Sequence, residues 1–248
     1  MRRAVVAALV AAAVLPGAAA AQFTPDAGKV WGPRVRVTPF VGTSPTVGRS
    51  ERWTVFGGSA FASSQIETDL GAGPVVGATL EVRAAGRFAF IASGVYVNRG
   101  QTQWFSSSEG EVFAGPGSDF IVAKAGVAMR LREPISDLQF RQLSASIFAA
   151  PALVHERPDR GLFSDPMLTK PINHWGANVG LEAEMPLGHP NFAFQAAVED
   201  YVILWDNREL AERFDAVAAR DGFTTDTSID IDPSHMLVFR AGLSVRFR

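Results

Sequence analysis

The sequence predicts an all-β fold, an eight-stranded antiparallel up-and-down barrel, and three observations support it. Eight segments alternate polar and apolar side chains with the two-residue period of a β-strand. Short and long connections alternate along the chain. The final segment, 235–247, is apolar along one whole face. Together these features favour a transmembrane barrel with short periplasmic turns and long extracellular loops.

The expected strands have the length that a tilted membrane-spanning strand needs, about 9–11 residues or slightly more. In one of them, Val179 and Leu181 alternate with Glu182 and Glu184, so the two faces differ sharply. The facing of 88–98 stays open, because apolar side chains lie on both of its faces. The expected strands are 34–42, 74–83, 88–98, 119–131, 139–154, 174–185, 192–203 and 235–247.

The connections separate into two classes. Those at 84–87, 132–138 and 186–191 are short and contain Gly or Pro, whereas the other four are long and polar. The strand-like segment 53–62 would give an odd strand number, which bacterial barrels avoid. We therefore place it in the first long connection, as a hairpin arm or an extension above the membrane, with a ten-stranded barrel as the alternative. The long connections are 43–73, 99–118, 155–173 and 204–234.

Residues 1–21 have the pattern of a secretory signal peptide. Arg2 and Arg3 precede an apolar run, and small residues up to Ala21 provide a cleavage site. We expect a periplasmic segment over 22–33 and the barrel over 34–248. The chain has no cysteine, which excludes a lipoprotein anchor, disulfides and thiolate metal sites. Its formal charge of −2 gives no reason to expect a nucleic-acid partner.

The last strand carries the most specific pattern. Arg240, Gly242, Val245 and Phe247 fit a polar-x-Gly-x-x-apolar-x-apolar signal close to the C-terminus. With this strand, the chain resembles the small outer-membrane β-barrel proteins of the OmpA, OmpX and OmpW kind in Gram-negative bacteria. It departs from many of them because Arg248 follows the terminal aromatic residue. The resemblance implies an outer-membrane location, contact with lipid and lipopolysaccharide, recognition by barrel-assembly machinery, and a monomer.

Aromatic residues occur near the ends of several strands, as interfacial girdles require. We expect Trp175, Tyr201 and Trp205 at the loop end, and Phe192 and Phe247 at the turn end. A soluble β-protein with these aromatic residues in its core is the alternative.

Charged side chains fall on the inward face of the expected strands. An eight-stranded barrel has an interior just wide enough for side chains, and buried charges need partners. We therefore predict an ion-pair network that fills the lumen, with a narrow polar path as the alternative. Ion pairing also explains Glu182 and Glu184 better than a pair of catalytic carboxylates does. The network residues are Arg36, Glu81, Arg83, Lys124, Arg130, Glu182, Glu184, Glu199, Arg240 and Arg246.

The fourth long connection contains a helix signal. Asp206 and Glu209 resemble a capping box. Leu210, Phe214 and Val217 then follow at helical spacing. We expect an amphipathic helix over 207–220 above the barrel mouth, packed as a lid, and the alternative is that its apolar face binds a ligand.

The sequence gives little evidence for a catalytic site or a metal-binding site. His155, His174 and His235 fall at the loop end of three strands, without the close ligand spacing of a zinc site. Ser234, His235 and Glu156 could form a hydrolytic constellation, but no nucleophile elbow accompanies them. We expect no enzyme, no cofactor and no metal.

Three functional hypotheses remain at this point. The first is a non-enzymatic outer-membrane barrel with a structural or surface-interaction role in the envelope. The second is an OmpW-like conduit for small solutes. The third is a soluble lipocalin-like barrel, which would place apolar side chains inside and charged ones outside.

Overall fold

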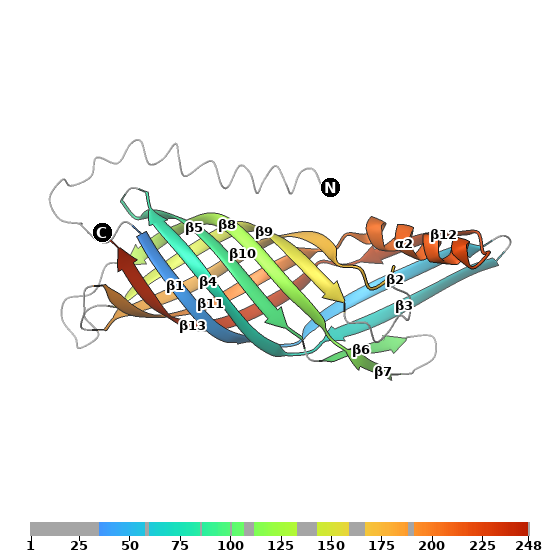
Figure 1. Cartoon of the computed structure of the whole chain (residues 1–248), viewed down its shortest axis with the longest axis horizontal. Helices are drawn as coiled ribbons and strands as arrows, with labels where there is room; N and C mark the ends of the chain where they lie inside the picture. The colour runs from blue at the N-terminus through green and yellow to red at the C-terminus, as the bar shows by residue number, and fades with distance from the viewer. Residues whose placement is uncertain are drawn as a thin grey trace.

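The computed structural model shows a closed β-barrel whose wall continues at one end into an open sheet (Figure 1). The structure describes residues 35–57, 60–84, 86–99, 101–106, 112–132, 143–158, 167–187 and 191–247. The expected signal peptide, the 22–33 segment and most of the turn expected at 132–138 lie outside these ranges. We call the two ends of the barrel the sheet end and the turn end.

The barrel has eight antiparallel strands in the order β1-β13-β11-β10-β9-β8-β5-β4, closed by pairing of β1 with β4. This confirms the predicted fold, and the ten-stranded alternative is wrong. β9 lies further along the chain than the expected 139–154, because residues 155–158 still pair with β8. The strands are β1 (Val35–Ser44), β4 (Gly73–Arg83), β5 (Phe88–Asn98), β8 (Ser118–Arg132), β9 (Ser144–Pro158), β10 (Ile172–Pro186), β11 (Phe192–Leu204) and β13 (Ser234–Phe247).

The sequence predicts loops at the long connections, but the structure shows additional strands in them. Three of them, 43–73, 99–118 and 204–234, supply a second, five-stranded sheet in the order β12-β2-β3-β6-β7, which we call the extended sheet. It continues the barrel wall outward, because β2 follows β1 and β3 leads directly into β4 (Figure 1). The segment 53–62 lies in the β2–β3 hairpin of this sheet, as predicted. Its strands are β2 (Val47–Gly57), β3 (Ala60–Leu70), β6 (Gln101–Ser106), β7 (Val112–Pro116) and β12 (Thr225–Ile231).

The predicted helix exists as α2 (Asn207–Arg220). The Asp206 carboxylate caps it by accepting from the backbone N–H of Glu209 at 3.2 Å. The chain leaves the helix through Gly222, whose φ of +89° is left-handed and suits glycine.

The expected position of α2 as a lid over the barrel rim is only partly right: the helix begins at the rim, where the Asp206 N–H binds His174, but its main packing is against β12. The helix runs along β12, away from the barrel (Figure 1). Phe214 meets the Trp53 ring of β2 edge-on at 5.6 Å, and Leu210 packs against the main apolar core. Val217 is half-buried on the same helix. The extended sheet attracts the helix because its face offers buried apolar side chains such as Ile229.

Asp215 fastens α2 to the edge strand β12. Its carboxylate accepts hydrogen bonds from the Thr225 hydroxyl and from the hydroxyl and backbone N–H of Thr227, at 2.6–3.1 Å. Partial desolvation raises the pKa of the Asp215 carboxyl, but these hydrogen bonds outweigh it and hold the pKa below its ordinary value. The carboxylate also accepts the backbone N–H of Thr227 on the edge strand β12, which could otherwise form a hydrogen bond with another strand.

We expect Asp215→Asn to loosen α2 from β12 by about 1 kcal/mol, because one amide oxygen cannot accept all three bonds. Since the folded pKa is depressed, the stabilisation is present above the unfolded value and is lost as pH falls through the folded value. The difference between variant and wild type should therefore shrink below about pH 4. Hydrogen exchange over 207–231 measures it, with the exposed Asp226→Asn as the control; equal exchange at pH 7 in both variants would contradict the idea.

The barrel wall has an apolar exterior. Val179 and Leu181 are 52% and 59% exposed, and Phe239 and Leu243 of β13 also face outward. The open question about β5 is settled, since Phe90 faces outward and its neighbours on either side are buried. No helix among the described residues is long and apolar enough to cross a membrane.

The expected aromatic girdles are partly wrong. Trp175 at the sheet end, and Phe192 and Phe247 at the turn end, are exposed on the outer surface. Tyr201 and Trp205 are instead buried, at 0% and 4% exposure. Tyr201 shares the inward parity of Glu199, and Trp205 lies just beyond the end of β11, at the barrel opening.

The interior divides into two halves along the barrel axis. Toward the sheet end it is an apolar core that includes Phe40, Val97, Phe120 and Val238. Toward the turn end, inward positions carry charged side chains. The lumen is therefore more apolar than an interior filled only by charges would be.

Candidate functional site

Arg36 is the centre of the charged half of the lumen. Its guanidinium forms salt bridges with Glu81, with Glu182 at 2.6 Å and with Glu184. Arg36 and Glu81 are directly paired across β1 and β4, whereas the other two acids reach across the lumen from β10. Arg246, the β13 neighbour of Arg36, also binds Glu184. The shared carboxylate offsets the repulsion between two adjacent arginines.

Glu199 is the second centre, and its side chain is fully buried. Its carboxylate pairs with Arg240 at 2.5 Å and with Lys124 at 2.6 Å, and it accepts a hydrogen bond from the Tyr201 hydroxyl. Arg240 also reaches Glu182 at 3.5 Å, which joins the two centres.

Further contacts satisfy the cations of this second centre. Lys124 donates to the Asn178 side chain at 2.7 Å and lies 4.5 Å above the Phe148 ring. Arg240 lies 4.5 Å above the Phe40 ring. Since aromatic faces attract cations, apolar side chains and ion pairs support each other here.

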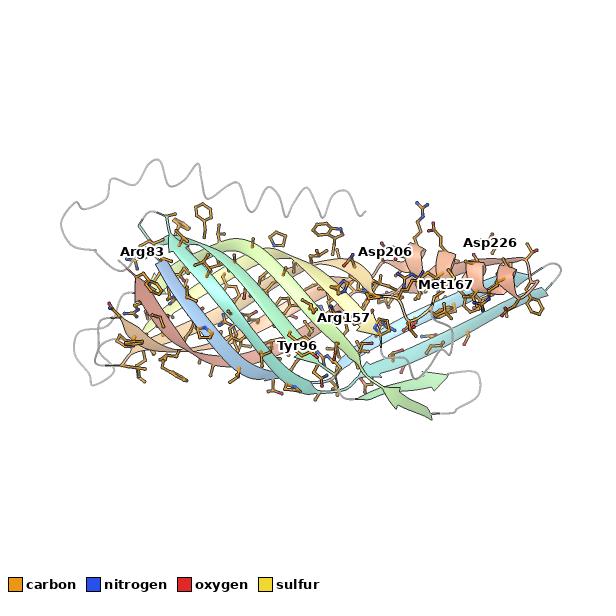
Figure 2. All side chains as sticks on the ribbon, viewed as in Figure 1. Arg83, Tyr96, Arg157, Met167, Asp206 and Asp226 are labelled. Atoms are coloured by element: carbon orange, nitrogen blue, oxygen red, sulfur yellow. The ribbon has the colours of Figure 1, made fainter. Side chains whose placement is uncertain are left out.

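Of the ten predicted network residues, the structure joins eight through salt bridges. Arg83 and Arg130 form no salt bridge within the described ranges. Both line a small cavity at the turn end of the lumen. Figure 2 shows Arg83 at that end of the barrel, away from the extended sheet.

A second polar group, the mouth cluster, lies at the sheet end and consists of Arg49, Glu51, Glu156, His174 and Trp205. Arg49 binds Glu51 at 2.6 Å, approaches Glu156 at 3.8 Å, and lies 4.7 Å above the Trp205 ring. Burial lowers the pKa of Arg49, but the two carboxylates outweigh it and raise the pKa further above its usual value. Arg49 therefore stays charged.

His174 connects the mouth cluster to the helix. Its Nδ1 accepts from the backbone N–H of Asp206 at 3.0 Å, so in the neutral ring Nε2 carries the proton and donates to Glu156, also at 3.0 Å. The Trp205 ring packs edge-on against the imidazole at 4.8 Å. These contacts hold the first turn of α2 at the barrel rim.

Arg99 fixes the junction between barrel and extended sheet. It is 2% exposed and donates to the carbonyls of Pro45 and Gly71 and to the Ser44 hydroxyl, at 2.6–2.8 Å. These acceptors lie where β1 continues into β2 and β3 into β4. Burial lowers the pKa of Arg99 to about 10, so it remains a cation at neutral pH.

The side chains of the possible hydrolytic constellation, Ser234, His235 and Glu156, bind different partners in the structure. His235 pairs with Asp200 at 2.8 Å on the outer surface, while Ser234 accepts from the Trp205 indole and Glu156 binds His174. The hydrolytic constellation therefore does not form. In the described part of the chain, no group of three or more His, Cys, Asp or Glu is placed to hold a metal ion.

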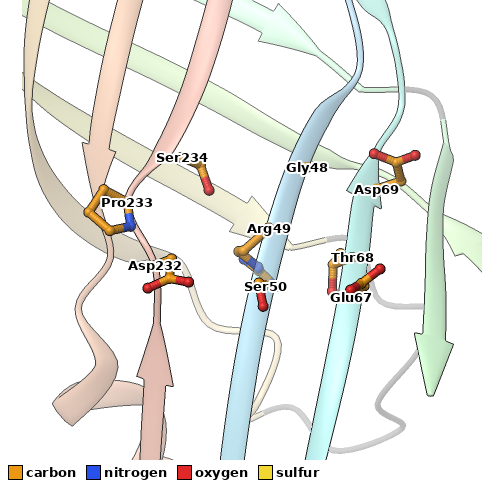
Figure 3. Close-up of a pocket in the computed structure, with 9 residues that line it drawn as sticks. All are labelled: Gly48, Arg49, Ser50, Glu67, Thr68, Asp69, Asp232, Pro233 and Ser234. Atoms are coloured by element: carbon orange, nitrogen blue, oxygen red, sulfur yellow. The ribbon is translucent and has the colours of Figure 1, made fainter. Parts of the chain in front are cut away.

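A polar recess of about 380 Å³ lies next to the mouth cluster (Figure 3). Strands β2 and β3 and the β12–β13 turn form its walls. Its charged lining is mostly acidic, with Arg49 as the cation. The recess residues are Gly48, Arg49, Ser50, Glu67, Thr68, Asp69, Asp232, Pro233 and Ser234.

No protein-family model and no curated protein matches the sequence. Among solved structures, the chain is similar to the outer membrane protein OprG of Pseudomonas aeruginosa. The identity is 12% and the TM-score is 0.51, with 88% of this chain and 98% of that chain covered. The chain has the fold of an outer-membrane β-barrel protein. A weaker similarity, to Neisserial surface protein A, has 9% identity and a TM-score of 0.40, over 84% and 97% of the two chains.

Sequence reasoning missed the mouth cluster of this barrel. Residues 47–53 have a two-residue period that brings Arg49, Glu51 and Trp53 to one face, so a signal was present. The pattern falls within a connection that the sequence predicts to be a loop, where alternation has no structural meaning. Arg99 gave no signal at all, since its partners are carbonyl groups of distant segments.

Proposed function

We propose that this chain is an integral outer-membrane barrel with a sealed lumen, that it is not an enzyme, and that it acts in the envelope through its extended sheet. The observation that carries this proposal is that side chains occupy the lumen in both of its halves. Ion pairs around Arg36 and Glu199 occupy the turn end. The apolar core and the mouth cluster occupy the sheet end.

The outer surface supports the membrane location. A barrel in a bilayer has an apolar outer band and a polar interior, which matches the outward Val179 and the inward Glu182 on the same strand. A lipocalin-like barrel would have the reverse arrangement. In this proposal the turn end faces the periplasm and the extended sheet is extracellular.

The extended sheet supports a surface role. Its strands and α2 form a packed structure, held at the rim by His174 and along β12 by Asp215. An ordered structure presents a fixed surface at low entropic cost. The polar recess beside Arg49 is the place on it where we expect a polar group of a surface partner to bind.

Assembly and targeting belong to the same proposal. Cleavage near Ala21 would release the chain into the periplasm, and Arg240, Gly242, Val245 and Phe247 would be read by barrel-assembly machinery. Val245 and Phe247 lie on the outward face of β13, next to the closing strand β1. The monomer would then contact lipid with its outer band and lipopolysaccharide at the sheet end.

Planar-bilayer recording tests the seal. We expect no stable single-channel openings from the purified full chain, because ion pairs and apolar side chains fill the described lumen. The double variant Arg240→Ala/Glu199→Ala removes two central side chains of the ion-pair network and should produce openings. Stable openings in the wild type would overturn the sealed-lumen proposal.

The second candidate is a conduit for small hydrophobic compounds. The apolar half of the lumen favours it, because a hydrophobic compound could partition among Phe40, Phe120 and Val97. Liposome uptake of a labelled hydrophobic compound distinguishes the two candidates. Uptake faster than in protein-free liposomes would favour the conduit.

A further inference from the structure

Among the described residues, the charges of the turn-end lumen do not balance. The inward positions that the structure describes there carry six cationic side chains and four carboxylates. The salt bridges described above use all four carboxylates, and each binds at least one of Arg36, Lys124, Arg240 and Arg246. Arg83 and Arg130 are the two cations that form no salt bridge among the described residues.

These two arginines face the same space. Arg83 on β4 and Arg130 on β8 line a cavity of about 20 Å³, together with Arg87 from the β4–β5 turn and Ser146 on β9. One terminal nitrogen of Arg83, Nη1, is buried and has no hydrogen-bond partner. Glu81 also borders the cavity, but its carboxylate binds Arg36.

A buried guanidinium N–H without an acceptor is costly, and the like charges of Arg83, Arg87 and Arg130 at one cavity add repulsion. An anion in the cavity would remove both costs, since arginines bind anions through several N–H donors at once. A volume of about 20 Å³ admits roughly one water-sized particle. A monoatomic anion fits inside that space, whereas a phosphate group would extend beyond it.

We propose that Arg83 and Arg130 form a halide-sized anion site at the turn end of the lumen, with Ser146 as an additional hydroxyl donor and chloride as the expected occupant. The site completes the charge balance of the lumen plug. It does not depend on the surface role proposed above, so either proposal can fail without the other.

Chloride titration of the full-length protein in detergent tests the site. Potassium chloride replaces potassium 2-(N-morpholino)ethanesulfonate at constant ionic strength, so that general screening stays the same. We expect the midpoint of thermal unfolding to rise by about 4 °C and to saturate. Bromide should act like chloride, and inorganic phosphate should have no effect beyond that of the sulfonate.

The variant Arg83→Gln/Arg130→Gln should lose the chloride dependence while keeping the fold, because it removes the excess charge. The matched control is Arg52→Gln/Arg208→Gln, in which both arginines are exposed, and it should keep the full response. Anomalous scattering from bromide-soaked crystals gives an independent readout, with a peak beside Arg83 and Arg130.

Two outcomes would overturn the proposal. A wild-type midpoint that does not respond to chloride, together with a destabilised Gln variant, would mean that a carboxylate of the chain itself balances the arginines. An equal response in wild type and Gln variant would place the chloride effect elsewhere.

Discussion

Replacing Glu199 with alanine is expected to lower the free energy of unfolding by about 3–5 kcal/mol. The carboxylate is fully buried and lies between Lys124 at 2.6 Å and Arg240 at 2.5 Å. Its removal leaves two desolvated cations next to each other without a counter-charge. The Tyr201 hydroxyl also loses its acceptor. The cost is therefore larger than that of a typical single substitution, about 1 kcal/mol.

Equilibrium unfolding in urea, in lipid vesicles and followed by tryptophan fluorescence, measures this effect. Glu212→Ala is the matched control, because its carboxylate is 62% exposed and pairs only with Arg208 on α2. Exposed pairs of this kind contribute at most about 1 kcal/mol. If both glutamate variants unfold at the same urea concentration, the lumen network does not stabilise the barrel.

The second large effect is expected on the outer wall. Val179→Arg should destabilise the inserted barrel by about 2–4 kcal/mol, because it places a charge near the middle of the apolar band. Val179 lies at the centre of β10 and is 52% exposed. In a soluble barrel, an arginine at this exposed position would cost little.

The control is Ser63→Arg, an exposed position on β3 of the extended sheet, where an added charge should have almost no effect. Folding into vesicles is measured by the mobility shift of unheated samples on a denaturing gel. Equal folding yields for the Val179 and Ser63 variants would contradict the membrane placement of the barrel wall.

The polarity pattern of β10 predicts its structure correctly. The β10 alternation of Val179 and Leu181 with Glu182 and Glu184 fixes both the strand and its facing, because opposite faces of a strand meet opposite environments. β5 could not be oriented in the same way. Its inward Val95 and Val97 contact other apolar side chains within the lumen, so polarity does not distinguish its two faces.

For the helix, the sequence predicts the element but not what it packs against. Asp206, Glu209 and the apolar spacing predicted α2 over its full length, since capping and periodicity are local properties. Its packing partner could not be predicted, because the apolar face of the extended sheet exists only after β12 pairs with β2. Leu210 and Phe214 therefore pack on a surface that forms from distant segments and cannot be read from the local sequence.

The sequence by itself determined the eight-stranded barrel, the outward apolar band, the inward charges and the helix, because each of these depends on the period of neighbouring residues. Only the tertiary structure decided that three of the long connections build an extended sheet, that Trp205 is buried, and which charges of the described residues remain unpaired. Those properties depend on the register between strands that are distant in the chain. Register places Glu184 between Arg36 and Arg246, and leaves Arg83 and Arg130 together at one cavity.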